Sequence, residues 1–490
     1  MRHNSEPGAI GVGDATIGET LEGGLASLRV KPIKSLFDGT RSGQRLGQAS
    51  IAALAVLVLG AGLTCVAQLV IARIIGPDSY GVYAYVLAWV TLLGYFSTLG
   101  FHVSLLRFVP SYEAKEEWAL ARGVIQYSQR VTAGAAISLV LIGIGVIVGL
   151  HRLLGSELAF SFLLGLAAVP FIALQLLSAS IIRAFGGVIA ALAPERVVRD
   201  GLLLAIVAAV AAGNLWHPNA TLAIGATLLS SIAMLGLVRI LLRRLRPPAL
   251  DRAKPAYTVE DWWLPTLPLT VMMIADNFMA RSAVIALGLM GQTRDAGVFA
   301  AAFSIATVTA LPRMAVATAF APTVSALFAL GDQAGLQSLS AKAAWLSLIG
   351  TACTAIPLLL LAQPLLAWFG RDFVGGVPIV TILVLGQMLA AACGPQQHLI
   401  TMTGNERAGA GILAVCAAIS FVSCLLVIGS FGMEGAALAT MLTLVGWNVA
   451  MGVFIHRGLH LVPGLVAFFT VMPASRRAAE DGSNLPKGVV

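Results

Sequence analysis

Charged residues are scarce in this 490-residue chain. Only 11% of the residues are Asp, Glu, Lys or Arg, whereas 58% are hydrophobic. A water-soluble domain has about 25% charged and about 45–50% apolar residues. The shortage of charge therefore excludes a water-soluble enzyme. Because long apolar runs recur along nearly the whole chain, a protein with one membrane anchor is excluded as well. The composition predicts an all-α, polytopic membrane protein.

Cysteine and nucleotide-binding motifs are also missing or rare. All five cysteines lie in apolar runs, and no CxxC or His/Cys spacing is present, so we expect no metal site and no cofactor. The absence of a nucleotide-binding motif argues against ATP as the direct driver. No apolar stretch begins before about residue 49, which argues against a cleavable signal peptide. Residues 1–47 are polar and are expected to form a disordered cytoplasmic tail.

The apolar runs predict about twelve transmembrane helices. A spanning helix needs about 20 mostly apolar residues. The expected spans are residues 49–72, 82–106, 124–149, 158–182, 199–216, 219–241, 264–289, 296–328, 343–367, 376–402, 408–430 and 434–456. The fifth is short because Glu195, Arg196, Arg199 and Asp200 delay its entry into the membrane. Another apolar stretch, 459–472, is too short to span and is expected at the interface.

The basic residues predict the orientation. The net charge is +8, and most of the 31 Lys and Arg residues lie on the side that carries the N-terminus. The loops on the other side hold only Arg73, Arg152, Arg294 and Arg371. By the positive-inside rule, the N-terminus is expected in the cytoplasm. The basic residues lie between apolar runs without interleaved aromatics, so we expect no nucleic-acid partner.

The two halves of the chain resemble each other. Gly76-Pro-Asp-Ser-Tyr-Gly81-Val-Tyr-Ala84 after the first span matches Gly291-Gln-Thr-Arg-Asp-Ala-Gly297-Val-Phe-Ala300 after the seventh. Phe108-Val-Pro110-Ser111 likewise matches Phe320-Ala-Pro322-Thr323. The offsets are 216 for the glycines and 212 for the prolines. This near-register predicts a duplicated six-helix unit, and an even number of helices makes the two copies parallel.

The duplication predicts two parallel six-helix lobes around a central cavity. The expected boundaries are an N-terminal lobe at 48–245, a cytoplasmic linker at 246–263 and a C-terminal lobe at 264–457. Residues 458–490 are expected to form a short apolar segment and a cytoplasmic tail.

The first loop carries a family resemblance. Ala72-Arg-Ile-Ile-Gly76-Pro-Asp-Ser-Tyr-Gly81-Val-Tyr-Ala84 resembles the first-loop signature of polysaccharide-export flippases in the multidrug/oligosaccharidyl-lipid/polysaccharide (MOP) exporter superfamily. Leu106-Arg-Phe108-Val-Pro110, Thr403-Gly404-Asn-Glu-Arg407 and Phe431-Gly432-Met-Glu-Gly435-Ala-Ala-Leu438 are similar to later elements of that family. The resemblance covers about residues 48–456. It implies a cavity that opens alternately to each side. It also implies flipping of undecaprenyl-pyrophosphate-linked oligosaccharides across the bacterial inner (cell) membrane.

Five charged residues within or near the spans are the main site candidates. A charge near the bilayer centre costs at least about 2.5–3.5 kcal/mol, so each such residue calls for an explanation. Arg281, Arg313, Arg107 and Arg130 give a net-positive interior that suits an anionic substrate, and a guanidinium binds phosphate oxygens bidentately. We therefore predict that they bind pyrophosphate. For Arg107 and Arg130, snorkelling to the inner interface is an equal alternative.

Asp276 is the only acid that the predicted spans place deep in the membrane. It is a candidate site for a coupling ion, H⁺ or Na⁺, and a structural partner for a neighbouring arginine is the alternative. Thr270, Asn277 and Arg281 share one helical face and form a predicted polar stripe.

Three glutamines are candidates for binding sugar hydroxyls: Gln68, Gln387 and Gln397. Hydrogen bonds between helices explain them equally well.

These features predict a flippase for lipid-linked oligosaccharides rather than an enzyme. Its partners are then the lipid-linked substrate and membrane lipids, and a glycan polymerase or export complex is consistent with that role. A multidrug exporter of the same superfamily and a lipid II flippase are alternatives. One aspartate against four arginines argues against export of cationic drugs. Short outer loops argue against a membrane glycan polymerase or ligase.

Overall fold

The computed structural model describes residues 41–150, 155–213 and 218–467. The chain divides into two compact units, residues 1–52 and 53–490. In the first unit the described residues, 41–52, are helical. The predicted tail at 1–47 therefore lies mostly outside the described residues, as does the end of the chain beyond residue 467.

The described part of the chain is helical and contains no strand. The helices of the N-terminal half are α3 (Arg41–Ser97), α4 (Phe101–Ala114), α5 (Trp118–Leu150), α6 (Ser156–Ala184), α7 (Val188–Ala193), the π-helix η1 (Pro194–Val198), α8 (Arg199–Ala212) and α9 (Ala220–Leu245). The short α10 (Pro248–Arg252) lies in the linker. Helices are expected throughout, because apolar surroundings force backbone groups to pair within their own segment.

The C-terminal half follows the same plan. It contains α11 (Val259–Leu289), α12 (Thr293–Thr307), the 3₁₀ turn η2 (Val308–Ala310), α13 (Leu311–Ala329), α14 (Gln333–Leu360), α15 (Ala362–Phe369), the 3₁₀ turn η3 (Arg371–Gly376), α16 (Val377–Cys393), α17 (Gln396–Met402) and α18 (Glu406–Leu459).

Nine helices in the described residues are long and apolar enough to cross a membrane. Two of them cover two predicted spans each. The first bends at Gly76, which has φ 77° and ψ 169°, and α18 bends at Gly432, which has φ 53° and ψ −140°. Glycine occupies both bends because it adopts positive φ without a Cβ clash. The nine helices therefore cover eleven of the twelve predicted spans, and the shorter helix at Arg199–Ala212 is the counterpart of the fifth. The protein is a multi-pass membrane protein.

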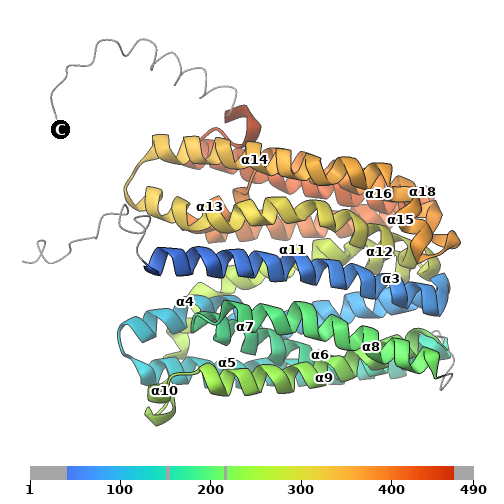
Figure 1. The fold of residues 1–490 in the computed structure, drawn as a ribbon, viewed down its shortest axis with the longest axis horizontal. Coiled ribbons are helices and arrows are strands. Elements are labelled where there is room, and N and C mark those ends of the chain that lie inside the picture. The colour runs from blue at the N-terminus through green and yellow to red at the C-terminus, as the bar shows by residue number, and fades with distance from the viewer. Residues whose placement is uncertain (1–40, 151–154, 214–217, 468–490) are drawn as a thin grey trace, which may run out of the picture. The chain divides into compact units, whose positions relative to one another are not determined.

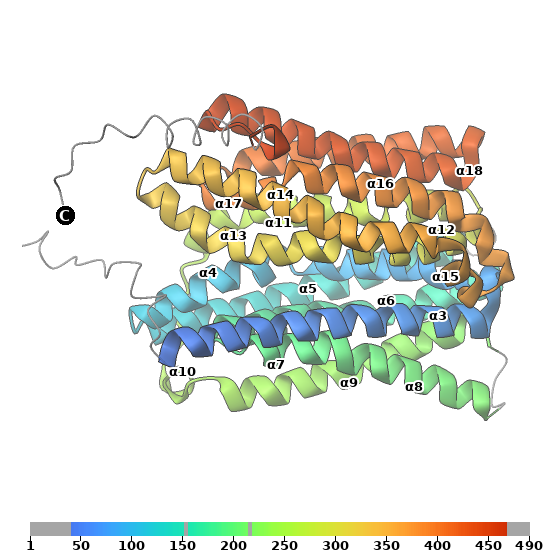
Figure 2. The same ribbon diagram turned by 45° about the horizontal axis from the view of Figure 1, so that its top comes forward.

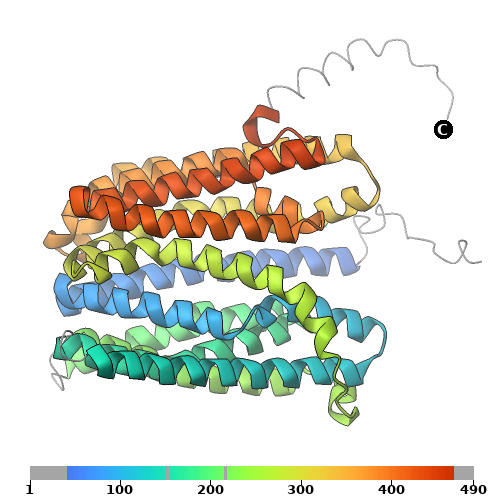
Figure 3. The same ribbon diagram turned by 180° about the vertical axis from the view of Figure 1, so that it is seen from behind.

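The helices of residues 53–459 form two lobes. In the N-terminal lobe α6 packs along α5 and α9, and α8 packs on α9. In the C-terminal lobe α11 and α16 pack along α18, and α13 packs on α14. The green and cyan helices of the first lobe and the orange and red helices of the second lie on opposite sides in Figure 1 and Figure 2. Figure 3 shows α11 running from the linker into the region between them.

The fifth span differs from its prediction. We expected it to begin at Arg199, but α7, η1 and α8 run without a break from Val188 to Ala212. The π-turn accommodates the charged residues Glu195 and Arg196 inside the helix. Asp200, in the first turn of α8, is buried in the protein at 3% exposure.

Candidate functional site

The second and eighth spans are both interrupted, at corresponding places in the two halves. The second breaks between α3 and α4, where Leu99 and Gly100 have φ of 45° and 77°. The eighth tightens into the 3₁₀ turn η2, between α12 and α13. Interrupted helices at matching positions of two repeats mark the usual position of a binding site in a membrane transporter. We therefore built the candidate site around these two places.

The break in the second span is stabilised by α11. The Thr270 hydroxyl donates to the Leu99 carbonyl, with an Oγ1–O distance of 2.9 Å. A Cβ on Gly100 would lie 2.0 Å from the same hydroxyl oxygen, so the two segments approach closely. Thr270 is 6% exposed. It therefore supports the helix break, and it does not extend the polar stripe of Asn277 and Arg281 into open space.

Arg281 is held by its own helix. Its Nη1 donates to both the backbone oxygen and the side-chain Oδ1 of Asn277, at 3.2 Å each. The Asn277 amide in turn donates to Met273 O at 3.0 Å. Tyr95 of α3 interacts electrostatically with Arg281 from the other lobe. These contacts orient the guanidinium and still leave it half-buried, with donors to spare.

Arg313 lies in the first turn of α13, the helix after the η2 turn. Its Nη2 donates to Gln387 Oε1 of α16 at 3.4 Å. Its buried Nε has no hydrogen-bond partner among the described residues. The structure thus joins two predicted site residues, Arg313 and Gln387, that are 74 residues apart. Gln387 acts here as an acceptor for the arginine.

Asp276 of α11 is the acidic residue of the candidate site. It interacts with both Arg313 and Arg281, yet it makes no ion pair within the described part of the chain, and its side chain is exposed. One carboxylate interacts electrostatically with two guanidiniums, so this group of three carries a net charge of +1. Charged side chains in this position can bind an anionic group without first breaking a strong internal pair.

The remaining predicted residues lie outside this group. Arg107 of α4 and Arg130 of α5 are exposed, and no hydrogen bond or ion pair joins either to another described residue. Gln68 accepts from the Tyr80 hydroxyl at 2.9 Å within the N-terminal lobe. Gln397 is half-buried on α17. Their predicted contacts with substrate stay predictions.

A second polar cluster, which the sequence did not lead us to expect, lies in the N-terminal lobe. Arg199 and Asp200 form an ion pair at 2.9 Å, and the Thr64 hydroxyl of α3 donates to the same carboxylate. Tyr83, also buried, interacts electrostatically with both charged residues. The signal was present in the sequence as a run of charges beside an apolar segment. From the sequence alone, however, that run of charges predicts the end of a helix, because the π-turn that continues the helix through it is not visible in the sequence.

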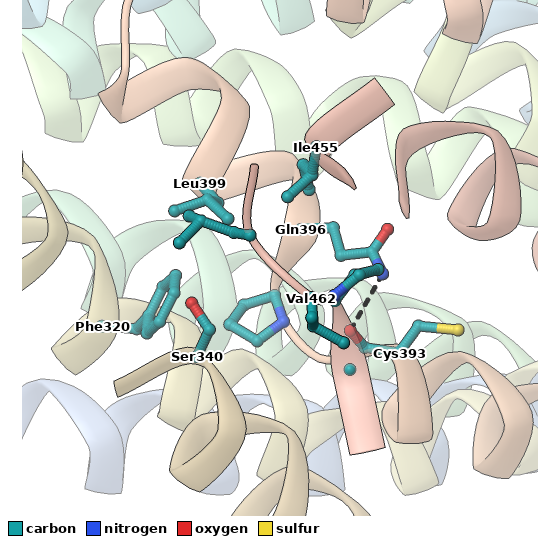
Figure 4. A pocket seen from close by; sticks show the side chains of 11 residues that line it. Phe320, Ser340, Cys393, Gln396, Leu399, Ile455 and Val462 are labelled. Carbon is teal, nitrogen blue, oxygen red and sulfur yellow. Dashed lines mark hydrogen bonds between the residues drawn. The ribbon is translucent and has the colours of Figure 1, made fainter. Parts of the chain in front are cut away.

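A small pocket in the C-terminal lobe was also not expected. Phe320, Ser340, Gln396, Leu399 and Val462 are among its lining residues (Figure 4). The Gln337 amide holds the segment that covers it, donating to Val462 O at 2.8 Å and accepting from Val462 N at 2.7 Å. Residues 461–467 of the predicted interfacial stretch 459–472 thus pack on the lobe itself.

Comparison with known proteins places these observations in a family. A family model described as "Polysaccharide biosynthesis protein" matches residues 46–328, more than half of the chain. The chain belongs to this family. The family match includes α3, with its kinked first loop, and α11 and α13, with Asp276, Arg281 and Arg313. No curated protein sequence matches the chain significantly.

Solved structures show the same fold at low sequence identity. An inward-facing multidrug resistance MATE family transporter of the MOP superfamily matches with a TM-score of 0.68 and 15% identity, over 86% of this chain and 99% of that one. The lipid II flippase MurJ in an inward closed conformation matches with a TM-score of 0.63 and 15% identity, over 89% and 94%. The predicted membership of the MOP superfamily is confirmed, as is the all-α fold of two six-helix lobes around a central cavity.

A third structure bears on the charge of the site. It is described as a MOP superfamily transporter from Pyrococcus furiosus whose reverse polarity of the binding pocket suggests a different function. It matches with a TM-score of 0.59 and 15% identity, over 84% of this chain and 95% of that one. Members of the fold therefore differ in the charge of their binding pockets, and the chemistry of each must be argued from its own residues.

Proposed function

We propose that this member of the polysaccharide biosynthesis protein family flips undecaprenyl-pyrophosphate-linked oligosaccharides across the bacterial inner membrane by alternating access. The observation that carries the proposal is the net positive charge of Arg281 and Arg313, beside interrupted helices, with which one carboxylate, that of Asp276, interacts electrostatically. A pyrophosphate is a dianionic, multi-oxygen group that two guanidiniums bind well. The lipid tail would remain in the bilayer while the head group crosses between the lobes.

The coupling ion is assigned to Asp276 on the same grounds. Among the described residues it is the acid that interacts electrostatically with both arginines, and it is exposed. Binding of H⁺ or Na⁺ there would raise the net positive charge of the site and so favour an anionic head group. The energy source is then an ion gradient, and the protein is a transporter, not an enzyme.

The direction of transport follows from the charge distribution of the loops. Most Lys and Arg residues flank the helix ends on the side of the N-terminus and the linker, which favours a cytoplasmic position for that side. The opposite end, with the kink at Gly76 and the start of α12, then faces the periplasm. Substrate is taken up between the lobes from the cytoplasmic leaflet.

A lipid II flippase is the second candidate, since the MurJ fold matches and lipid II carries the same pyrophosphate chemistry. A multidrug exporter is the third, because the MATE fold matches. Cationic drugs would meet two arginines at the site, which disfavours the third candidate on simple Coulomb grounds.

The test is flipping in proteoliposomes. Purified protein is reconstituted with an undecaprenyl-pyrophosphate oligosaccharide, and exposure of the glycan is followed with an impermeant glycosidase. Faster exposure than in empty vesicles supports the proposal, and lipid II in parallel vesicles separates the second candidate. No acceleration with any of several glycans, in protein shown to be folded, would overturn it. Efflux of a cationic dye would then become the relevant assay.

A further inference from the structure

One face of α9 is exposed along most of its length. Figure 1 and Figure 2 show this helix at the edge of the N-terminal lobe. On its inner face Met234 and Val238 belong to a buried cluster with Ala179 and Ile182 of α6. The exposed residues lie on the opposite face of the helix: Leu229, Ile232, Ala233, Gly236, Arg239, Ile240, Arg243 and Arg244. Because α9 crosses the membrane, this outer face is the one that meets the lipids.

The first part of the outer face is apolar and open. Leu229, Ile232 and Ile240 are 55%, 41% and 52% exposed. Gly236 lies between the two isoleucines on the same face, and a Cβ there would meet no atom within 4 Å. The space beside the backbone is therefore accessible to a hydrocarbon chain. This part of the face fits the acyl chains of a phospholipid.

The last two turns of the same face are basic. Arg239, Arg243 and Arg244 are exposed, and none of the three forms an ion pair with another described residue. Residues four apart on a helix are neighbours, with their Cβ atoms about 5–6 Å apart. Arg239 and Arg243 can therefore contact the same phosphate group, to which a guanidinium donates two parallel hydrogen bonds.

The linker adds two more basic residues at this end of α9. Arg246 pairs with Asp251 of α10 at 3.1 Å, which holds the linker close to the end of α9. Arg122 of α5 donates to the backbone oxygen of Asp251 at 2.6 Å. The linker is thus held from two sides, and its exposed Arg252 and Lys254 stay beside the end of the helix. Since the charge of Asp251 is balanced by Arg246, it does not offset the other cations.

The corresponding span of the second half, in the last part of α18, lacks this basic end. Its outer face is also apolar, because Leu442, Val449 and Val453 are exposed. That face ends at His456 and Arg457. The two halves therefore offer similar surfaces to acyl chains and differ in the number of guanidiniums at the end. The basic end is a property of α9 and not of the repeated unit.

We propose that the outer face of α9 binds an anionic phospholipid, with its acyl chains beside Ile232 and Ile240 and its phosphate at Arg239 and Arg243. Basic residues that cluster at the end of a transmembrane helix attract anionic lipids. A zwitterionic lipid gains less, because the one acid of residues 239–254, Asp251, is already paired and cannot bind its cationic group. The site goes beyond the proposed function, since its ligand is a lipid of the bilayer and not the transported substrate.

The test compares two lipids at two positions of the full-length protein. In a variant with the five native cysteines replaced by alanine, Ile240→Cys carries a bimane fluorophore, the α9 label. Val453→Cys carries the same fluorophore as the α18 label. Each protein is reconstituted with phosphatidylcholine and either brominated phosphatidylglycerol or brominated phosphatidylcholine. Bromine quenches the fluorophore that it contacts. We expect phosphatidylglycerol to be preferred about fivefold at the α9 label and less than about twofold at the α18 label.

Substitutions of the arginines show whether charge causes the preference. Arg239→Gln, Arg243→Gln and Arg244→Gln together should lower the preference at the α9 label to that at the α18 label. The triple lysine variant at the same positions should keep most of the preference, because an ammonium attracts phosphate as a point charge. Arg457→Gln is the matched control and should leave the α9 label unchanged. If the triple glutamine variant does not fold, Arg243→Gln alone should lower the preference by a smaller factor.

Equal quenching by the two lipids at the α9 label, or a preference that survives the loss of the three arginines, would overturn the proposal. Inorganic phosphate should lower the preference no more than sodium chloride of equal ionic strength does, since a lipid site loses only through screening. A larger loss would indicate a site for the free anion and would also overturn the proposal.

The proposed function fails separately, because this measurement contains no lipid-linked glycan. A lipid preference without flipping would leave the lipid site standing, and normal flipping without a lipid preference would leave the substrate assignment standing.

Discussion

The two polar clusters of the molecule treat charge in opposite ways. In the N-terminal lobe, Asp200 is buried and fully engaged, by Arg199 at 2.9 Å and by the Thr64 hydroxyl. Between the lobes, Asp276 is exposed and has two arginines within electrostatic range but no ion pair among the described residues. A paired internal charge holds helices in register, whereas an unpaired one retains the capacity to bind something that arrives. This difference separates the structural cluster from the functional one.

The largest expected effect comes from removing both arginines of the functional cluster, which consists of Asp276, Arg281 and Arg313. Replacing Arg281 and Arg313 together by glutamine should slow flipping about 100-fold, because two charge-assisted hydrogen bonds of about 1.5 kcal/mol each are lost. Thermal stability should stay close to that of the parent, since neither side chain is part of a closed ion pair. The measurement is the proteoliposome assay with the pyrophosphate-linked glycan. Unchanged flipping by the double variant would remove the proposed phosphate role.

Substitutions in the structural cluster of Arg199, Asp200 and Thr64 should change the stability of the protein rather than its binding of substrate. Arg199→Leu leaves a buried carboxylate with only the Thr64 hydroxyl and should lower the free energy of unfolding by about 2 kcal/mol. Arg199→Leu with Asp200→Leu should recover most of that loss, because no uncompensated charge then remains. Thermal unfolding in detergent reports both variants. A double variant as unstable as the single one would show that the cluster is held together by more than this pair.

Composition, run length and the repeated loop were enough to predict the fold, and the first-loop motif was enough to predict the superfamily. These predictions hold because each of them depends on many residues, or on a bend that only glycine makes easily, as at Gly76. The hydrogen bond between Arg313 and Gln387 was not accessible from the sequence, since it depends on how α13 and α16 pack. The buried cluster of Arg199 and Asp200 was missed for a local reason. The π-turn at Pro194–Val198 continues a helix through charges that ordinarily end a span.

The Asp276 carboxylate either binds the coupling ion or serves as a structural partner of the arginines, and a substitution that removes its charge distinguishes the two roles. If it binds the coupling ion, Asp276→Asn should keep slow flipping and lose most of its dependence on an imposed ion gradient. The amide is similar in shape but cannot change its charge. The assay compares flipping rates with and without a proton or sodium gradient across the vesicle. Full gradient dependence in the variant would make Asp276 a structural partner of Arg281 and Arg313 and would move the coupling site elsewhere.

The smallest effect is expected for the exposed arginines outside both clusters. Arg107→Gln with Arg130→Gln should slow flipping by a factor of about 3 or less, because exposed charges are screened and interact weakly with a bound group. The same glycan assay, run at low and at high salt, checks this directly. At low salt the deficit should grow if these residues attract the head group from a distance, since screening weakens such attraction. A loss as large as that of the Arg281 and Arg313 double variant would extend the phosphate site to all four arginines. Arg281 and Arg313 would then form the inner part of a longer row of basic residues that binds the head group.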